Sequence, residues 1–488
     1  MLFNSYIFIL LFLPATLFIF HALRTSGRHR MATAALAFAS LVFYGWWSLQ
    51  ALLLLLILMA ANYAVVWRLL RSAAGAARLR LALVVTGVAG NLLVLGYFKC
   101  SNFFLENWSA LFGTEVDFVA VVLPLGLSFF TFQKIALLVD AYEGRVRHFD
   151  LLGYILFVTF FPQLIAGPIV HHSEVMPQFA LSDSMRKKDF AQGLVLFVIG
   201  LSKKVLVADT IAQLVGPAFD AAAVGKLPSI VQAWTAALAY TLQLYFDFSG
   251  YSDMAIGLAL LFGIRLPANF NSPYKALNII EFWRQWHMTL SRFLRDYLYV
   301  PLGGNRRGEV RRYLNLLVTM VLGGLWHGAA WTFVLWGALH GIFLVINHLW
   351  IALRPQIGLI GPSNFFTRFV SRTITFVAVV TAWVFFRAAD LNSAVLMLRA
   401  MAGNGGHVEA TMDAAYGLEM ITALLAIVWF APNSLELTAY AFAKKQAALN
   451  RIRFEGPMSP HWAIVCGLLL AFCLMSLTQV SEFLYFQF

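Results

Sequence analysis

Apolar stretches about as long as one transmembrane helix, roughly 20 residues, recur from one end of the chain to the other. Because 61% of the 488 residues are hydrophobic and only 12% are charged, a water-soluble globular domain of this length is excluded. We therefore expect an all-α polytopic membrane protein, a single integral domain over 1–488 with about 11–12 transmembrane helices. The expected spans are 3–22, 32–47, 49–70, 79–98, 118–139, 228–246, 313–333, 334–350, 367–387, 417–431 and 462–479.

The net charge of +12 indicates how the chain is oriented in the membrane, because Lys and Arg collect in cytoplasmic loops. The strongest such stretch is 265–312, with nine Lys or Arg against three acids, and it is expected in the cytoplasm together with the basic stretch 444–453. The connection 100–117 has no Lys or Arg and, like the acidic stretch 407–413, is expected on the opposite side. No nucleic-acid partner is expected from this charge.

Two segments predict an irregular path at membrane depth. Residues 151–170 are apolar but have basic flanks on both sides, and Pro162, Gly167 and Pro168 would break a regular helix. A re-entrant segment that lines a cavity explains both features, since irregular backbone survives in a membrane only where protein or water covers it. The same reasoning predicts a second re-entrant segment at 250–264.

Residues 281–300 (EFWRQWHMTLSRFLRDYLYV) place charge beside aromatic side chains. The spacing predicts an amphipathic helix at the membrane interface, with Arg284 and His287 on its polar side. The apolar side repeats every three or four residues and contains Phe282, Trp286, Leu290, Phe293 and Tyr297.

One histidine, His327, lies inside the apolar segment 322–337 (LGGLWHGAAWTFVLWG). An ionisable residue at membrane depth is costly, so it is a functional candidate by default. On the helix expected at 313–333, His327 would stand one turn from Trp331, above glycines 324 and 328 that allow close helix approach. A neutral imidazole there would be available as a general base. A core histidine that bonds to a backbone carbonyl is the equally weighted alternative.

The other histidines are weaker candidates. His287, near two arginines, could position an anionic or polar acyl donor, although a structural surface histidine is the commoner case. His340 shares a helix face with Asn347, and a structural role is favoured there. His171 and His172 are adjacent, so in a regular helix they would point in different directions, and they do not form a metal pair. The cysteines lack metal-ligand spacing, so no metal site is expected.

Two carboxylates, Asp247 and Asp253, lie in the polar stretch YFDFSGYSD. Paired carboxylates at the edge of a span could form a proton or cation path, which would make the protein a secondary transporter. They could equally cap a re-entrant turn. Transporters usually show paired halves, and no internal repeat is visible in this sequence.

Several motifs together resemble the membrane-bound O-acyltransferase family, and within it the bacterial alginate O-acetyltransferase subgroup, which borders on the teichoic acid D-alanyl transferases. The resemblance implies a ring of helices around a thinned centre, with its core at about 118–350 and peripheral helices at 1–100 and 367–488. The matching stretches are FNSYIFILLFLP, VFYGWW, LGYFKCSNF, LPLGLSFFTFQ, FFPQLIAGPI, LYFDFSGYSDMAIG, EFWRQWHMTLSRFLRDYLYVPLGGNRRG, LGGLWHGAAWTFVLWGALHG and FLYFQF.

The resemblance implies that His327 is the catalytic residue and His287 a second active-site position. It further implies a multi-pass protein of the bacterial inner membrane that moves acetyl from a cytoplasmic thioester, acetyl-CoA, for O-acetylation of an exported polysaccharide such as alginate. The immediate acceptor is either the sugar or a serine on a periplasmic partner of the SGNH-hydrolase type. The alternatives are a D-alanyl transferase with a carrier protein as donor, and the transporter. Further candidates for substrate binding are Trp326, Arg284, Trp286, Asp253 and His340.

Overall fold

The computed structural model describes the chain except for residues 74, 114–120, 180–186, 358–363, 406–411, 441–459, 478–481 and 485–488. The stretch 444–453, most of 407–413 and the beginning of the span expected at 118–139 therefore lie outside the described residues.

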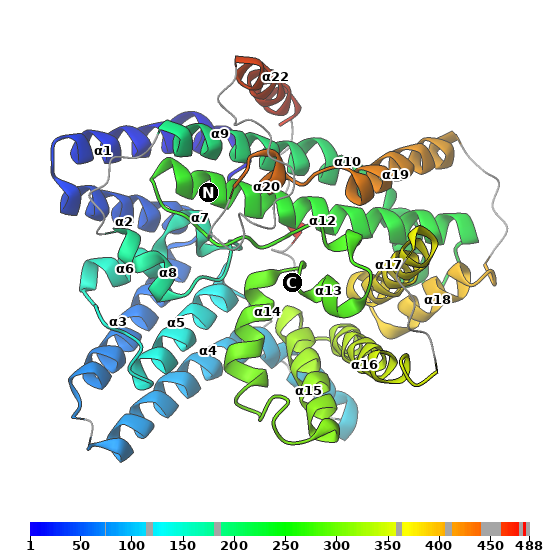
Figure 1. The fold of residues 1–488 in the computed structure, drawn as a ribbon, viewed down its shortest axis with the longest axis horizontal. Helices are drawn as coiled ribbons and strands as arrows, with labels where there is room; N and C mark the ends of the chain where they lie inside the picture. The colour runs from blue at the N-terminus through cyan, green and yellow to red at the C-terminus, as the bar shows by residue number, and fades with distance from the viewer. Residues whose placement is uncertain are drawn as a thin grey trace.

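Helices make up the fold, and no strand occurs among the residues described (Figure 1). The first half contains η1 (Ile7–Phe12), α1 (Leu13–Thr25), α2 (His29–Gly45), α3 (Leu49–Arg71), α4 (Ala77–Phe112), α5 (Leu127–Tyr142), α6 (Leu151–Thr159), α7 (Phe161–Leu164), α8 (His172–Phe179), α9 (Lys187–Ser202), η2 (Lys203–Ala208), α10 (Asp209–Ile211), η3 (Ala212–Leu214) and α11 (Gly216–Ala223). The second half contains α12 (Ile230–Leu261), η4 (Pro273–Lys275), α13 (Ile279–Trp283), α14 (Met288–Leu294), η5 (Arg295–Tyr299), α15 (Glu309–His327), α16 (Trp331–Leu353), α17 (Phe365–Arg387), α18 (Leu391–Met401), α19 (Met412–Phe430), α20 (Ser434–Leu437) and α22 (Pro460–Ser476).

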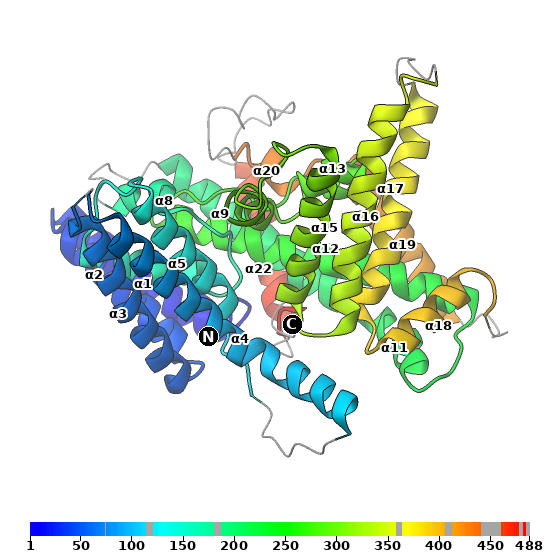
Figure 2. The same ribbon diagram turned by 90° about the horizontal axis from the view of Figure 1, so that it is seen from below.

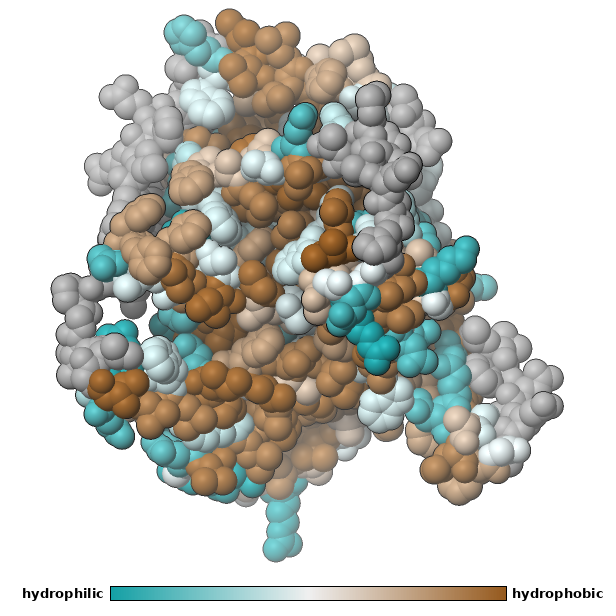
Figure 3. Space-filling model, turned by 90° about the vertical axis from the view of Figure 1, so that its right-hand side faces the viewer, coloured by the Kyte–Doolittle hydropathy of each residue, from teal (hydrophilic) through white to brown (hydrophobic). Residues whose placement is uncertain are grey.

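Five helical segments are long and apolar enough to cross a membrane: η1 with α1, α3, α4, α16 and α17. Less than half of each apolar window is buried inside the molecule, so many of these side chains point outward. Apolar side chains also cover much of the face in Figure 3, where hydrophilic ones form separate patches. Outward apolar surface of this extent suits contact with lipid. The protein is a multi-pass, all-helical membrane protein, as the sequence predicted.

The central helix is α12, which links two groups of helices (Figures 1 and 2). Its first half packs into a core shared with α16 and α17, and its second half into a core shared with α1 to α8. Helix α9 lies against it at two glycine contacts. A Cβ on Gly200 would stand 2.5 Å from the carbonyl oxygen of Gly250, and one on Gly257 would stand 2.5 Å from that of Gly193. Only glycine permits so close an approach of the two backbones.

The re-entrant segment predicted at 250–264 is wrong, because α12 runs without a break from Ile230 to Leu261. The polar residues that suggested a break have partners inside the protein. Gly250 makes the contact with α9, Asp253 pairs with Lys203, and Ser252 accepts a hydrogen bond from Asn269. Buried polar groups with partners do not interrupt a helix.

The connection predicted at 100–117 is also wrong for most of its length, since α4 continues to Phe112. Its polar residues bond to neighbouring segments or along the helix. Asn102 accepts a hydrogen bond from the backbone of Val121, and Asn107 accepts one from the Trp331 indole. The helix therefore carries polar side chains without ending.

Residues 151–170 do contain the break that the prolines predicted. Helix α6 ends at Thr159, α7 begins at Phe161, and the chain beyond Leu164 is non-helical but buried. The Gln163 side chain donates to the carbonyl oxygen of Phe157 across the break. Protein thus covers this irregular backbone. Its re-entrant path through a membrane stays a prediction.

Candidate active site

His327 is the last residue of α15, directly before the turn into α16. The two helices cross at a glycine notch. A Cβ on Gly324 would stand 2.2 Å from the Phe333 carbonyl oxygen, and one on Gly337 would stand 2.3 Å from that of Met320. The close helix approach expected at Gly324 is therefore confirmed, whereas Gly328, the other glycine of the expected pair, lies beyond the end of α15.

The helix expected at 313–333 ends six residues early. Gly328 has an extended backbone, φ −159° and ψ 139°, and this conformation ends α15. Trp331 consequently begins α16 and is 55% exposed, so it does not stand one turn above His327. The histidine lies at a helix end and not in the middle of a span.

Lys99 of α4 holds this helix end. Its ammonium donates to the carbonyl oxygen of His327 at 2.9 Å and lies 5.8 Å from the ring centre of Trp326. The last carbonyls of a helix have no partner within the helix and carry partial negative charge, so a cation is favoured there. Sequence reasoning missed Lys99. The available signal was a lysine at the end of an apolar span, inside the stretch LGYFKCSNF.

Aromatic rings surround the His327 imidazole, which is 6% exposed. The ring centres of Trp326, Trp336 and Phe386 lie 4.8, 5.1 and 5.3 Å from it. These residues come from α15, α16 and α17. The enclosure excludes bulk water, so the imidazole lies in a low-dielectric site, where electrostatic interactions are stronger than in water.

His287 lies beside the same tryptophan, with its ring centre 6.4 Å from that of Trp326. It is fully buried, so the surface histidine considered from the sequence is wrong. Its Nδ1 lies 3.0 Å from the Asn269 side-chain oxygen, which also accepts from the Thr289 hydroxyl. This pattern assigns the Nδ1 proton to the bond with Asn269, so in the neutral ring Nε2 is the basic nitrogen.

The continuous amphipathic helix predicted at 281–300 is wrong. Helix α13 ends at Trp283, α14 begins at Met288, and His287 between them has a left-handed backbone with φ 41°. The turn directs His287 inward while Arg284 stays exposed, so these two residues do not share a face. Trp286 is buried and packs on Trp383, with ring centres 5.1 Å apart, behind the His327 enclosure.

His340 continues the aromatic enclosure from α16. Its ring centre lies 4.9 Å from that of Trp336, which in turn contacts His327. The imidazole is fully buried among rings and, among the described residues, neither nitrogen has a hydrogen-bond partner. It therefore lies behind Trp336 and contributes to the wall of the site.

Asp253 and Asp247 both lie on α12, and each forms an ion pair with a lysine of η2. Asp253 accepts from the Lys203 ammonium at 2.6 Å and from the Ser434 hydroxyl at 2.7 Å. Asp247 lies 2.8 Å from the ammonium of Lys204. Because both carboxylates are inside a continuous helix, the turn-capping role considered from the sequence is wrong. They connect α12 to η2 and α20.

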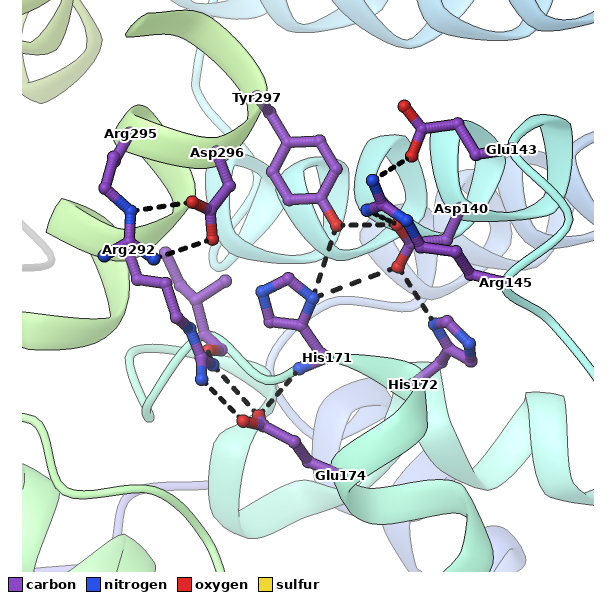
Figure 4. A network of polar contacts seen from close by, with 11 residues as sticks. Asp140, Glu143, Arg145, His171, His172, Glu174, Arg292, Arg295, Asp296 and Tyr297 are labelled. Carbon is purple, nitrogen blue, oxygen red and sulfur yellow. Dashed lines mark hydrogen bonds and ion pairs between the residues drawn. The ribbon is translucent and has the colours of Figure 1, made fainter. Parts of the chain in front are cut away.

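A second polar network lies where α5, α8 and η5 meet (Figure 4). The Asp140 carboxylate accepts from the Tyr297 hydroxyl at 3.1 Å, and the imidazoles of His171 and His172 lie 3.9 and 3.2 Å from it. Sequence spacing suggested that the two histidines diverge. They converge because His171 precedes the first turn of α8.

Ring contacts connect this network to the site. Tyr297 stacks on Phe293, Phe293 on Phe132, and Phe132 on Trp326, with ring centres 5.0, 4.2 and 5.0 Å apart. Trp326 then contacts His327. Among the described residues, no group of three or more His, Cys, Asp or Glu side chains is placed so that it could hold a metal ion.

Comparison with known protein families identifies the part of the chain that contains the candidate site. Residues 82–388 match the family model of the membrane-bound O-acyltransferases. This range contains Lys99, His287 and His327.

Curated relatives cover the whole chain. A probable alginate O-acetylase AlgI of Pseudomonas putida is 38% identical over 100% of both chains. A peptidoglycan O-acetyltransferase of Helicobacter pylori is 42% identical over 83% of this chain and 80% of its own. A teichoic acid D-alanyltransferase of Bacillus subtilis is more distant, at 27% identity over 52% of this chain and 65% of its own.

Proposed function

The chain belongs to the membrane-bound O-acyltransferase family, and on that premise we propose that it transfers acetyl from a cytoplasmic thioester to a hydroxyl group on an exported polysaccharide or on a partner protein. Full-length similarity to a probable alginate O-acetylase favours acetyl as the group transferred. The observation that carries the chemistry is His327 at the end of α15, enclosed by rings and beside the tryptophan that also contacts His287.

We assign His327 the role of general base. The acceptor hydroxyl gives its proton to the imidazole as its oxygen attacks the thioester carbonyl, and a tetrahedral intermediate forms. The carbon–sulfur bond then breaks, and the imidazolium returns the proton to the leaving thiolate. General base catalysis by a positioned histidine contributes about 10²–10⁴ in rate. The thioester supplies the driving force.

His287 is proposed to hold or polarise the donor carbonyl, with Asn269 fixing its tautomer. Trp326 is the proposed side wall shared by the two histidines, because it contacts both rings. Trp286 and His340 support this wall from behind. Asp253 and Arg284, once candidates for substrate binding, have no observed contact with these rings.

The proposed donor is acetyl-CoA, and the basic stretch 265–312 is the proposed side of its approach. The proposed location is the bacterial inner membrane, with the acceptor on the outer side. A polysaccharide such as alginate is the proposed final acceptor, reached directly or through a periplasmic SGNH-type partner. The orientation rests on the distribution of charge, and the acetyl group and alginate are taken from the name of the Pseudomonas putida relative. The donor, the inner membrane and the SGNH-type partner rest on the family resemblance alone.

The test is transfer of labelled acetyl from acetyl-CoA in membranes that contain the wild-type chain or His327→Ala, with and without candidate acceptors. Label that reaches an acceptor only with intact His327 supports the proposal. Transfer of D-alanine from a charged carrier protein, but no transfer of acetyl, would show that the donor is the carrier protein and not acetyl-CoA. Equal transfer by His327→Ala at equal protein level would remove His327 from the mechanism.

The transporter hypothesis loses its main support. It needed Asp247 and Asp253 as carboxylates available to a proton or cation. Each of them has a lysine within 2.8 Å.

A further inference from the structure

We propose that a groove between α16 and α17 binds an anionic phospholipid of the membrane. The groove lies apart from the catalytic site, and the proposal is independent of the acyltransferase assignment. It encloses about 840 Å³ and is bounded by α16, by α17 and by the beginning of α13. A volume of this size accommodates a lipid headgroup with the upper part of its chains.

The sides of the groove are apolar and face outward. Helix α16 contributes Ile346 and Trp350 one turn apart, and α17 contributes Phe366, Val370 and Ile374 at the same spacing. Ile346 and Ile374 are 57% and 65% exposed, although both lie in helices apolar enough to span a membrane. An apolar surface between two such helices meets lipid chains, and Figure 2 shows the helices side by side.

One end of the groove is cationic. Arg354 directly follows α16, and Arg368 lies in the second turn of α17. Both are exposed, and neither makes an ion pair with any described residue. The predicted orientation places this end at the cytoplasmic face, where anionic lipids collect.

The order of groups along the groove matches the order in a phospholipid. A phosphate at Arg354 and Arg368 would place the acyl chains along Ile346, Ile374 and Ala378. A soluble anion would need only the arginines. The apolar sides extend from the charged end along the rest of the groove. The proposed occupant is therefore a lipid and not a free phosphate or a nucleotide.

Occupancy would also connect the groove to the catalytic site mechanically. Helix α16 carries Trp336 and α17 carries Phe386, and both rings contact His327. A lipid that bridges the cytoplasmic ends of the two helices would restrict their separation. The protein should therefore unfold at a higher temperature with the anionic lipid bound.

The experiment is native mass spectrometry of the full chain in detergent with equimolar phosphatidylglycerol and phosphatidylcholine. A basic residue near the headgroup favours an anionic lipid by about fivefold, so two arginines predict a preference of about 30-fold. R354Q/R368Q should bring the ratio close to one. R28Q/R30Q, which removes two exposed arginines elsewhere, should leave the ratio unchanged.

A second pair of variants tests the apolar part. Ala378→Trp fills the groove and should reduce retention of phosphatidylglycerol, because the indole occupies the space that the acyl chains need. Val377→Trp, on the neighbouring exposed position outside the groove, is its control and should retain the lipid.

Three results would overturn the proposal. The wild type would retain both lipids equally, or R28Q/R30Q would lose the preference as fully as R354Q/R368Q. In the third, glycerol 3-phosphate or acetyl-CoA at the same concentration would displace the lipid, which would make the groove a site for a soluble anion. If R354Q/R368Q does not fold, the proposal is tested by the two tryptophan variants, and equal retention of phosphatidylglycerol by Ala378→Trp and Val377→Trp would contradict it.

Discussion

The surroundings of His327 and the α12–η2 contact are both buried, but they treat ionisable groups in opposite ways. Around His327 the neighbours are rings, and the nearest cation, Lys99, bonds to the backbone and not to the imidazole. At the α12–η2 contact, Lys203 and Lys204 each meet a carboxylate within 2.8 Å. Charge that is balanced within the protein serves structure, whereas an imidazole enclosed by rings can change its protonation during a reaction.

The largest effect is expected for His327→Ala. Loss of the general base should reduce acyl transfer by about 10²–10⁴, because the acceptor hydroxyl would keep its proton. The measurement is transfer of labelled acetyl at equal protein level, with the unfolding temperature as control. A fall of less than tenfold in a well-folded variant would show that the ring enclosure does not mark the base.

Removing one partner of the α12 ion pair should affect stability and not chemistry. Lys203→Met leaves the Asp253 carboxylate buried without its cation, which costs about 3–5 kcal/mol. Thermal unfolding in detergent measures the loss. Transfer activity per folded molecule should stay close to that of the wild type.

The matched control removes both charges. Lys203→Met/Asp253→Asn should recover much of the lost stability, because no uncompensated charge remains buried. If the double variant is instead inactive while folded, Asp253 belongs to the active site, and the two regions are not functionally distinct.

A smaller effect is expected at Lys99, which bonds to the backbone of His327. Lys99→Met keeps the length of the side chain but removes the bond to the His327 carbonyl oxygen, and transfer should fall by about tenfold. His327 is still present but is held less well, so kcat should fall. KM for the donor should change little, because Lys99 does not contact the donor in this proposal. Lys99→Arg should restore part of the rate. A rise in KM alone would mean that Lys99 contacts the donor and does not position the helix end.

The smallest effect is expected for Arg284→Gln, with a change in transfer of less than about twofold, since exposed charges away from a site contribute little. Arg284 is exposed, whereas His287 is fully buried. The measurement is KM for the thioester donor over a range of salt concentrations. A tenfold rise in KM at low salt would show that Arg284 does contribute to binding of the donor.

The aromatic enclosure shows why much of the site could not be read from the sequence. His327 and Trp326 are adjacent in the chain, and the segment that contains them was recognisable by its lone histidine. Trp336, Phe386 and Lys99 come from three other helices. Periodicity within one segment carries no information about which distant helix packs on it.

Local conformation limited the predictions around His287. The spacing of aromatic residues at 281–300 is compatible with one helix, and His287 would then face solvent. The left-handed backbone at His287 divides the helix and turns the imidazole inward, where it meets Asn269. A bond to a residue outside the segment fixes this conformation, so helix spacing alone pointed to the wrong face.

The sequence by itself determined the class of fold and the identity of the central candidate. Apolar runs long enough to cross a bilayer leave a helical membrane protein as the solution, because backbone groups in lipid must bond within their own helix. Only the tertiary structure decided which polar residues pair with a charge inside the protein and which lie among aromatic rings. Asp253 and His327 look alike as ionisable residues in apolar stretches, but rings of other helices contact His327, whereas Asp253 lies 2.6 Å from the Lys203 ammonium. That distance depends on how separate helices pack against one another, and no single stretch of sequence contains it.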